Sequence, residues 1–140
     1  MKFQVPIHMF DVELDINTRI AESKFAGNFP KLLASGIWNA AFDKPVLILE
    51  YLGEELPEKG WDRHQVRRVI RSRLKELHSL GISHNDIRIP NIHVSRSGKI
   101  SLIDFGLSDR SNDESHKERD FEILDRILGF EGDSDNAYDE

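Results

Sequence analysis

The sequence predicts an α+β fold, in which helices and strands are segregated instead of alternating. Helical spacing of apolar residues predicts three helices. Short apolar runs predict two strands before the second helix and a hairpin after it. The order along the chain is helix, two strands, helix, polar loop, hairpin, helix. This order favours an α+β domain and argues against a doubly wound parallel sheet.

The first helix is expected over Phe10 to Lys24, where Val12, Ile16 and Ile20 recur four residues apart. A strand is then expected from Leu32 to Ile37. The compact apolar run Val46 to Leu49 predicts a second, buried strand.

The second helix has the clearest boundaries. Asp62 is a favourable N-cap with Gln65 at capping-box spacing, and Gly81 suits the left-handed position after the last turn. One apolar stripe lies between them: Val66, Ile70, Leu74 and Leu77.

A hairpin is expected next, with strands at Ile92 to Val94 and Lys99 to Ile103 joined by Ser95 to Gly98. The last helix is expected over Glu118 to Leu128, and Gly129 stops it. Its buried face would carry Phe121, Leu124 and Ile127.

Composition narrows the class of protein. The 140 residues fit one domain, and the absence of cysteine excludes disulfides and thiolate zinc sites. We expect residues 1–130 to form that domain and the tail 131–140, with five acidic residues and no basic one, to be disordered. No apolar run suits a signal peptide or a membrane span, so we expect an intracellular protein, cytoplasmic or nuclear. The helix face that carries Arg67, Arg71 and Lys75 is interpreted as a solvated face, because no aromatic residues interleave with it and the whole chain is acidic, so a nucleic-acid partner is not expected.

Polar residues with a chemical role are concentrated in two segments, 84–91 and 104–106. Phosphoryl transfer requires a carboxylate that faces the attacking hydroxyl and oxygen ligands that hold magnesium against the phosphates. Asp86 suits the first task, and Asn91 with Asp104 suits the second, because the hairpin folds the chain back between them. Taken singly, each is an ordinary turn residue.

The pattern His-x-Asp-x-x-x-x-Asn followed by Asp-Phe-Gly resembles the catalytic loop and metal-binding motif of protein kinases. The resemblance implies that ATP and Mg²⁺ are bound, with Asp86 as the base and Asn91 and Asp104 as metal ligands. It also implies that His84 supports the loop and that Arg88 replaces a phosphate-contacting lysine.

The resemblance extends toward the N-terminus. Residues 46–53 are similar to the fifth strand and hinge of kinases. This similarity implies that Leu49 is the gatekeeper and that the backbones of Glu50 and Leu52 meet adenine.

Glu13 resembles the helix glutamate that pairs with a nucleotide-binding lysine, although a solvated helix residue is an equal alternative. Asp120 resembles the aspartate that braces the catalytic loop, and its alternative is a favourable carboxylate at a helix N-terminus.

Several features depart from typical protein kinases. Asn85 replaces the usual arginine, and only thirteen residues separate Gly106 from Asp120. That short segment resembles atypical types: the Rio, tRNA-modification-associated, and aminoglycoside or choline kinases. No glycine-rich loop precedes Glu13, and Lys2 lies only eleven residues before it. The expected architecture is therefore a protein-kinase-like fold with an incomplete N-lobe, lacking the glycine-rich loop and lysine strand, and a truncated helical C-lobe.

Two functions are open on these grounds. One is an ATP- and magnesium-dependent phosphotransferase, of Ser/Thr or small-molecule type, with a protein or small molecule as acceptor. The alternative is a catalytically inactive, pseudokinase-like scaffold. A third interpretation is a truncated gene product whose uncovered apolar surface binds a protein partner.

Overall fold

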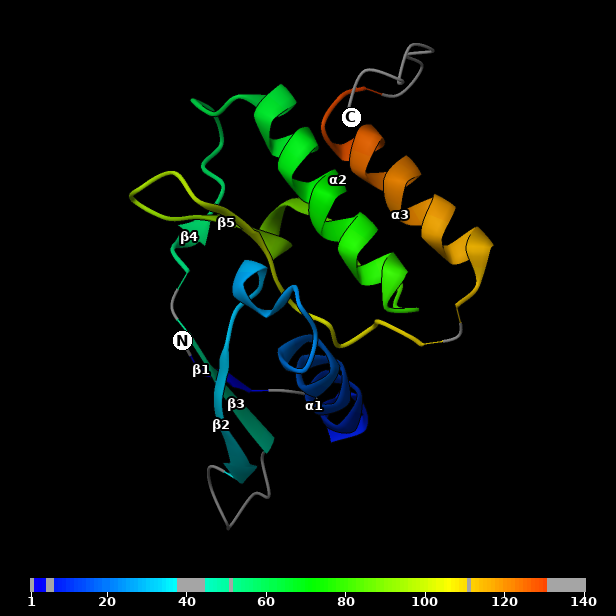
Figure 1. The fold of residues 1–140 in the computed structure, drawn as a ribbon. Coiled ribbons are helices and arrows are strands. Elements are labelled where there is room, and N and C mark those ends of the chain that lie inside the picture. Colours follow the sequence, from blue (N-terminus) through cyan, green and yellow to red (C-terminus); the bar gives the residue numbers. More distant parts are fainter. Residues whose placement is uncertain (1, 5–6, 38–44, 51, 111, 131–140) are drawn as a thin grey trace.

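A computed structural model describes residues 2–4, 7–37, 45–50, 52–110 and 112–130. Within these residues there are three α-helices and two three-stranded sheets, which confirms the α+β class. Figure 1 shows α1 beside the sheet formed by β1, β2 and β3, and α2 and α3 side by side in the other part of the molecule.

The first sheet has the order β1–β3–β2, and both of its pairings are antiparallel. Its strands are β1 (Lys2–Gln4), β2 (Leu32–Ile37) and β3 (Pro45–Leu49). The apolar patterns in the sequence predict β2 and β3 but not β1, because three residues are too few to show a period.

Helix α1 (Ile7–Ala21) begins and ends three residues before the predicted bounds. Its C-terminal end is set by Ser23, whose hydroxyl donates to the carbonyl of Ile20 at 2.8 Å and accepts from the N–H of Phe25 at 3.1 Å. Such a serine competes with continued helix for backbone groups. The chain then makes a 3₁₀ turn (Ala26–Asn28) and enters β2.

Helix α2 (Arg63–Ser79) has the ends that the sequence predicts. The Asp62 side chain accepts from the backbone N–H groups of His64 and Gln65 at 2.9 and 3.2 Å. At the other end Gly81 has φ +77°, and the N–H of Ile82 reaches the Leu77 carbonyl at 3.0 Å. This is the bond pattern of a Schellman motif.

The second sheet has the order β4–β5–β6, with β4 (Glu54–Glu55), β5 (Ile92–Val94) and β6 (Ile100–Leu102). The hairpin β5–β6 was predicted, whereas β4, two exposed glutamates, was not. Gly53 lets β4 approach, since it has φ +95° and an added Cβ would lie 2.1 Å from the Val94 carbonyl oxygen.

Helix α3 (Glu114–Ile127) starts four residues before the predicted bound at Glu118. The reason is an N-cap that the sequence analysis overlooked: Asp113 accepts from the N–H of Ser115 at 2.8 Å and from its hydroxyl at 2.7 Å. The same two bonds hold the pKa of Asp113 below its ordinary value.

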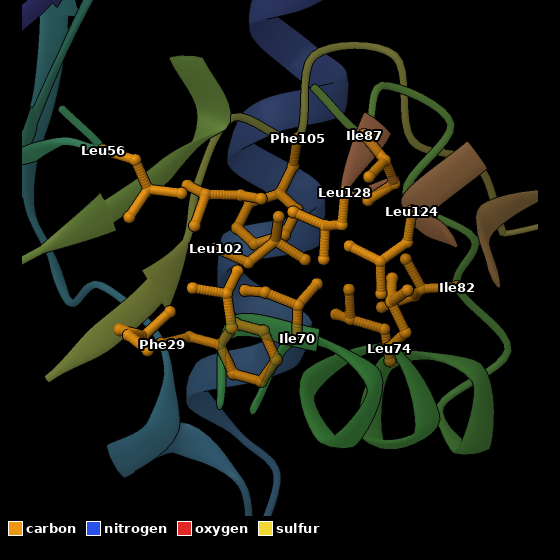
Figure 2. Close-up of a cluster of buried hydrophobic side chains, with 14 of the residues drawn as sticks. Phe29, Leu56, Ile70, Leu74, Ile82, Ile87, Leu102, Phe105, Leu124 and Leu128 are labelled. Atoms are coloured by element: carbon orange, nitrogen blue, oxygen red, sulfur yellow. The ribbon is translucent and has the colours of Figure 1, made fainter. Parts of the chain in front are cut away.

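Among the described residues, an apolar core joins the two parts of the molecule. It takes side chains from α1, α2, α3, β5, β6 and the loop before β2. Figure 2 shows its labelled members, among them Phe29, Ile70, Leu102 and Phe105. The rings of Phe29 and Phe105 lie 6.1 Å apart, so the loop after α1 packs directly on the segment that follows β6.

The predicted disordered tail, 131–140, lies outside the described residues. In the part of the chain that is described, no helix is both long and apolar enough to cross a membrane.

Candidate active site

The polar loop 84–91 begins where α2 ends and is held at its start by a short backbone ladder. Ser83 and Asp109 exchange both backbone hydrogen bonds, at 3.1 and 3.2 Å. The Ser108 hydroxyl donates to the carbonyl of His84 at 3.0 Å. The segment after Gly106 therefore lies against the loop that carries Asp86.

Asp120 braces this loop from α3, as the resemblance implied. Its Oδ2 accepts from the N–H of His84 at 2.8 Å, and its Oδ1 accepts from the N–H of Asn85 at 2.9 Å. The residue is 1% exposed, so these bonds are shielded from water. His78 of α2 bonds the same Oδ2 at 2.9 Å, a partner that no sequence signal indicated.

His84 is a structural residue, as predicted. Its Nε2 lies 2.9 Å from the Ile103 carbonyl, and its Nδ1 lies 3.1 Å from the backbone nitrogen of Asp86. A carbonyl can only accept and an N–H can only donate, so the ring is neutral with its proton on Nε2. Complete burial lowers the pKa of His84, which agrees with that state. The ring links the loop to the residue before Asp104.

Asn91 joins the other two candidate residues. Its Nδ2 donates to the backbone carbonyl of Asp86 at 2.8 Å and to the Asp86 carboxylate at 3.1 Å. The backbone carbonyl of Asn91 accepts from the N–H of Ile103 at 2.9 Å. Asp86, Asn91 and the strand end that leads into Asp104 are thus tied together by three hydrogen bonds.

Arg88 lies on the solvent side of this cluster. Its Nε is 3.3 Å from Oδ1 of Asp86, and its side chain is 58% exposed. Such an exposed pair contributes little to stability, so Arg88 remains available to meet a ligand. Its predicted contact with phosphate stays a prediction.

Two residues of the site have left-handed backbone conformations. Asn85 and Asp104 both have φ 69°. Asparagine and aspartate are the non-glycine residues that tolerate this region best, because their short side chains bond nearby backbone. The Asn85 amide bonds the Leu107 carbonyl at 3.0 Å, and Oδ1 of Asp104 accepts from the N–H of Gly106 at 3.1 Å.

Glu13 is part of this cluster, and its alternative as a solvated helix residue is wrong. It is 4% exposed, and its Oε1 accepts from the N–H of Phe105 at 2.7 Å. Asn17, one turn later on α1, donates to Oε2 at 3.1 Å. Burial, then a hydrogen bond with Asp104 and the charge of that carboxylate, raise the pKa of Glu13 to about 8. The Glu13 carboxyl group therefore carries its proton at neutral pH.

The expected lack of a lysine partner for Glu13 stays a prediction. Strand β1 carries Lys2 and pairs with β3, which ends at the candidate hinge. The backbone register sets Lys2 opposite Ile48, whereas the candidate gatekeeper Leu49 lies one residue further along.

The candidate hinge residues lie in the first sheet and in the segment that leaves it. Leu49 ends β3 and is 3% exposed, and Leu52 is 8% exposed. The N–H of Glu50 donates to the Lys31 carbonyl at 2.9 Å. The predicted contact of the Glu50 and Leu52 backbones with adenine stays a prediction. Tyr51 lies outside the described residues.

The donor set fits magnesium better than zinc. Asn91 and Asp104 offer an amide oxygen and a carboxylate, which are ligands that Mg²⁺ prefers. Among the described residues no group of three or more histidines and carboxylates could hold a metal alone.

Comparison with protein families gives the relationship directly. A family model described as the ABC1 atypical kinase-like domain matches residues 24–131. The chain belongs to this family. The protein-kinase-like relationship expected from the catalytic motifs is therefore confirmed, and ABC1 specifies an atypical type other than those suggested by the short segment after Gly106. The match includes the segments with Asp86, Asn91 and Asp104 but begins after α1, so it does not include Glu13.

Curated relatives named as kinases match shorter segments. Serine/threonine-protein kinase pakA of Talaromyces marneffei is 46% identical over 46 residues, which is 33% of this chain and 7% of that protein. Protein kinase kin1 of Schizosaccharomyces pombe is 44% identical over 61 residues, 44% of this chain and 7% of that one. The hormonally up-regulated neu tumor-associated kinase of Mus musculus is 41% identical over 54 residues, with shares of 36% and 8%. The chain thus spans less than a tenth of these relatives.

Proposed function

We propose that this kinase-like domain binds ATP with Mg²⁺ and transfers the terminal phosphoryl group to a hydroxyl of an acceptor. The observation that carries the proposal is the hydrogen bonding of Asn91, whose side chain holds Asp86 and whose carbonyl holds the residue before Asp104. These bonds support the proposal because they hold Asp86, Asn91 and the residue before Asp104 together. Positioning of this kind is what phosphoryl transfer needs most.

The proposed reaction balances with these residues. The acceptor oxygen attacks the γ-phosphorus, the bond from that phosphorus to the β–γ bridging oxygen breaks, and ADP leaves. Asp86 accepts the proton of the acceptor hydroxyl. Asn91 and Asp104 would hold Mg²⁺, which when bound neutralises charge on the phosphates. The backbones of Glu50 and Leu52 and the side chain of Leu49 would receive the adenine.

The acceptor is proposed only as a class, a protein or a small molecule with a hydroxyl. A protein partner is also proposed for the first sheet. Leu33 and Ile48, in β2 and β3, are 57% and 37% exposed. Large apolar side chains that are exposed on a sheet favour a covering partner.

A second candidate, an inactive scaffold, is favoured by one observation at Glu13. Its two carboxylate oxygens are bonded by the N–H of Phe105 and the amide of Asn17, both uncharged groups. A site without a lysine there lacks one cationic contact to phosphate. Loss of one such electrostatic donor costs ~10²-fold or more in rate.

The proposal is tested by a thermal-shift titration with ATP, with and without Mg²⁺. Wild type is compared with Asp104→Ala and with Asp11→Ala, an exposed carboxylate of α1 that serves as the matched control. We expect stabilisation by ATP that depends on Mg²⁺ in wild type and in Asp11→Ala, and its loss in Asp104→Ala. If ATP fails to stabilise wild type with Mg²⁺ present, the proposal fails. Stabilisation without turnover would favour the scaffold.

A further inference from the structure

A cavity of about 410 Å³ is lined in part by Glu50, which is also a candidate contact of adenine. It is bounded by the last turns of α1, the loop before β2 and the side chain of Glu50, with Lys99 from the β5–β6 hairpin. Its size falls within the range of pockets that hold small ligands, roughly 300–1,000 Å³. None of the residues assigned to the base or to the metal lines it.

The lining combines an apolar floor with cations at its edge. Ile20 and Phe29, each 2% exposed, are members of the buried core. Lys31 and Lys99 are exposed, and within the described ranges neither ammonium group pairs with a carboxylate. Glu50 also lines the cavity, but its Oε1 already accepts from the N–H of Lys31 at 3.2 Å. The net character of the edge is cationic.

We infer that this cavity is a binding site for a small amphipathic anion, an apolar ring or chain that ends in a carboxylate or sulfonate. The apolar part would lie over Ile20 and Phe29, where burial of the ligand's own apolar surface supplies the affinity. The acidic head would lie between Lys31 and Lys99, where charge supplies selectivity over a neutral ligand of the same shape.

The site is connected to the candidate active site through Asn17. This residue lines the cavity, is 4% exposed, and donates through Nδ2 to the backbone carbonyl of Glu13 at 2.8 Å and to its carboxylate at 3.1 Å. Glu13 in turn accepts from the N–H of Phe105, next to Asp104. A ligand against Asn17 would change nucleotide affinity, and nucleotide would change ligand affinity by the same factor. This coupling rests on the proposed function, whereas binding of the anion does not.

The test uses 2-naphthoate as the probe and 2-naphthylmethanol as its neutral counterpart, titrated into the ¹⁵N-labelled chain and followed by amide chemical shifts. We expect 2-naphthoate to shift the amides of Asn17, Gly27, Leu32 and Lys99 and the alcohol to bind more weakly. Lys31→Met with Lys99→Met should raise the Kd for 2-naphthoate by roughly 2- to 30-fold, the range for two exposed ion pairs.

Two further variants sharpen the test. Lys24→Met removes a cation from the same loop that does not line the cavity, so the Kd should stay within about twofold of wild type. Ala21→Phe places a large side chain at the cavity wall, at the last residue of α1, and should abolish binding. Equal affinity for the alcohol, shifts centred elsewhere, or full binding by Ala21→Phe would overturn the site. An ATP affinity that 2-naphthoate leaves unchanged would overturn the coupling.

Discussion

Replacement of Asp120 by alanine should loosen the loop that carries Asp86 without touching any residue proposed to contact substrate. The carboxylate accepts from the buried N–H of His84 and the part-buried N–H of Asn85, at 2.8 and 2.9 Å. Alanine removes both acceptors and leaves the donors without a partner. The loop then has to open toward water or keep two unsatisfied groups.

The expected cost follows from those two bonds. A buried donor left without an acceptor costs about 1–3 kcal/mol, so Asp120→Ala should lower the free energy of unfolding by roughly 2–6 kcal/mol. Domains of this size are stable by about 5–15 kcal/mol, so the variant is at risk of unfolding. Asp120→Asn keeps one side-chain oxygen as an acceptor, so its free energy of unfolding should fall by about half as much.

The assay is urea unfolding of wild type, Asp120→Ala and Asp120→Asn, together with amide hydrogen exchange at His84 and Asn85. Glu118→Ala, an exposed carboxylate on the same helix, is the control and should change stability by about 0.5 kcal/mol or less. The account is refuted if Asp120→Ala costs no more than Glu118→Ala, or if the two amides remain protected as in wild type.

Three further predictions concern stability. The pKa of Glu13, raised to about 8 from an ordinary 4.5, gives stability that is complete below pH 4.5 and lost as the pH rises through 8. The free energy of unfolding measured in urea should therefore fall by roughly 2–3 kcal/mol from pH 6 to 9, and this fall should be absent in Glu13→Gln. Gly53→Ala should cost more than Gly60→Ala in thermal unfolding, since both have φ +95° but only the first meets the Val94 carbonyl; equal costs would contradict this. Asp62→Ala should cost ~1 kcal/mol in urea unfolding through the lost cap, and no effect would contradict the cap.

Local signals predicted most of the fold. The cap at Asp62 and the glycine at Gly81 gave the bounds of α2, because their bonding partners lie within a few residues. Strands β1 and β4 were missed, since what fixes them is pairing with a partner distant in the chain. The start of α3 was misplaced because the Asp113 cap was overlooked.

The candidate site was only partly predictable. The motif spacing indicated Asp86, Asn91 and Asp104, and the structure ties the segments that carry them together. Burial of Glu13 against Phe105 depends on tertiary packing that no spacing reveals. Asn17, four residues after Glu13, could have been suspected from helical geometry, whereas nothing local pointed to the bond between His78 and Asp120.

The most direct test of the central claim is single-turnover transfer of labelled γ-phosphate from ATP with Mg²⁺, measured as ADP formed and label moved to water or protein. Wild type should transfer phosphate, and Asp86→Asn should bind ATP equally well while losing ~10²-fold or more in rate. Wild type that binds ATP without transferring phosphate, or Asp86→Asn that keeps the full rate, would contradict the account.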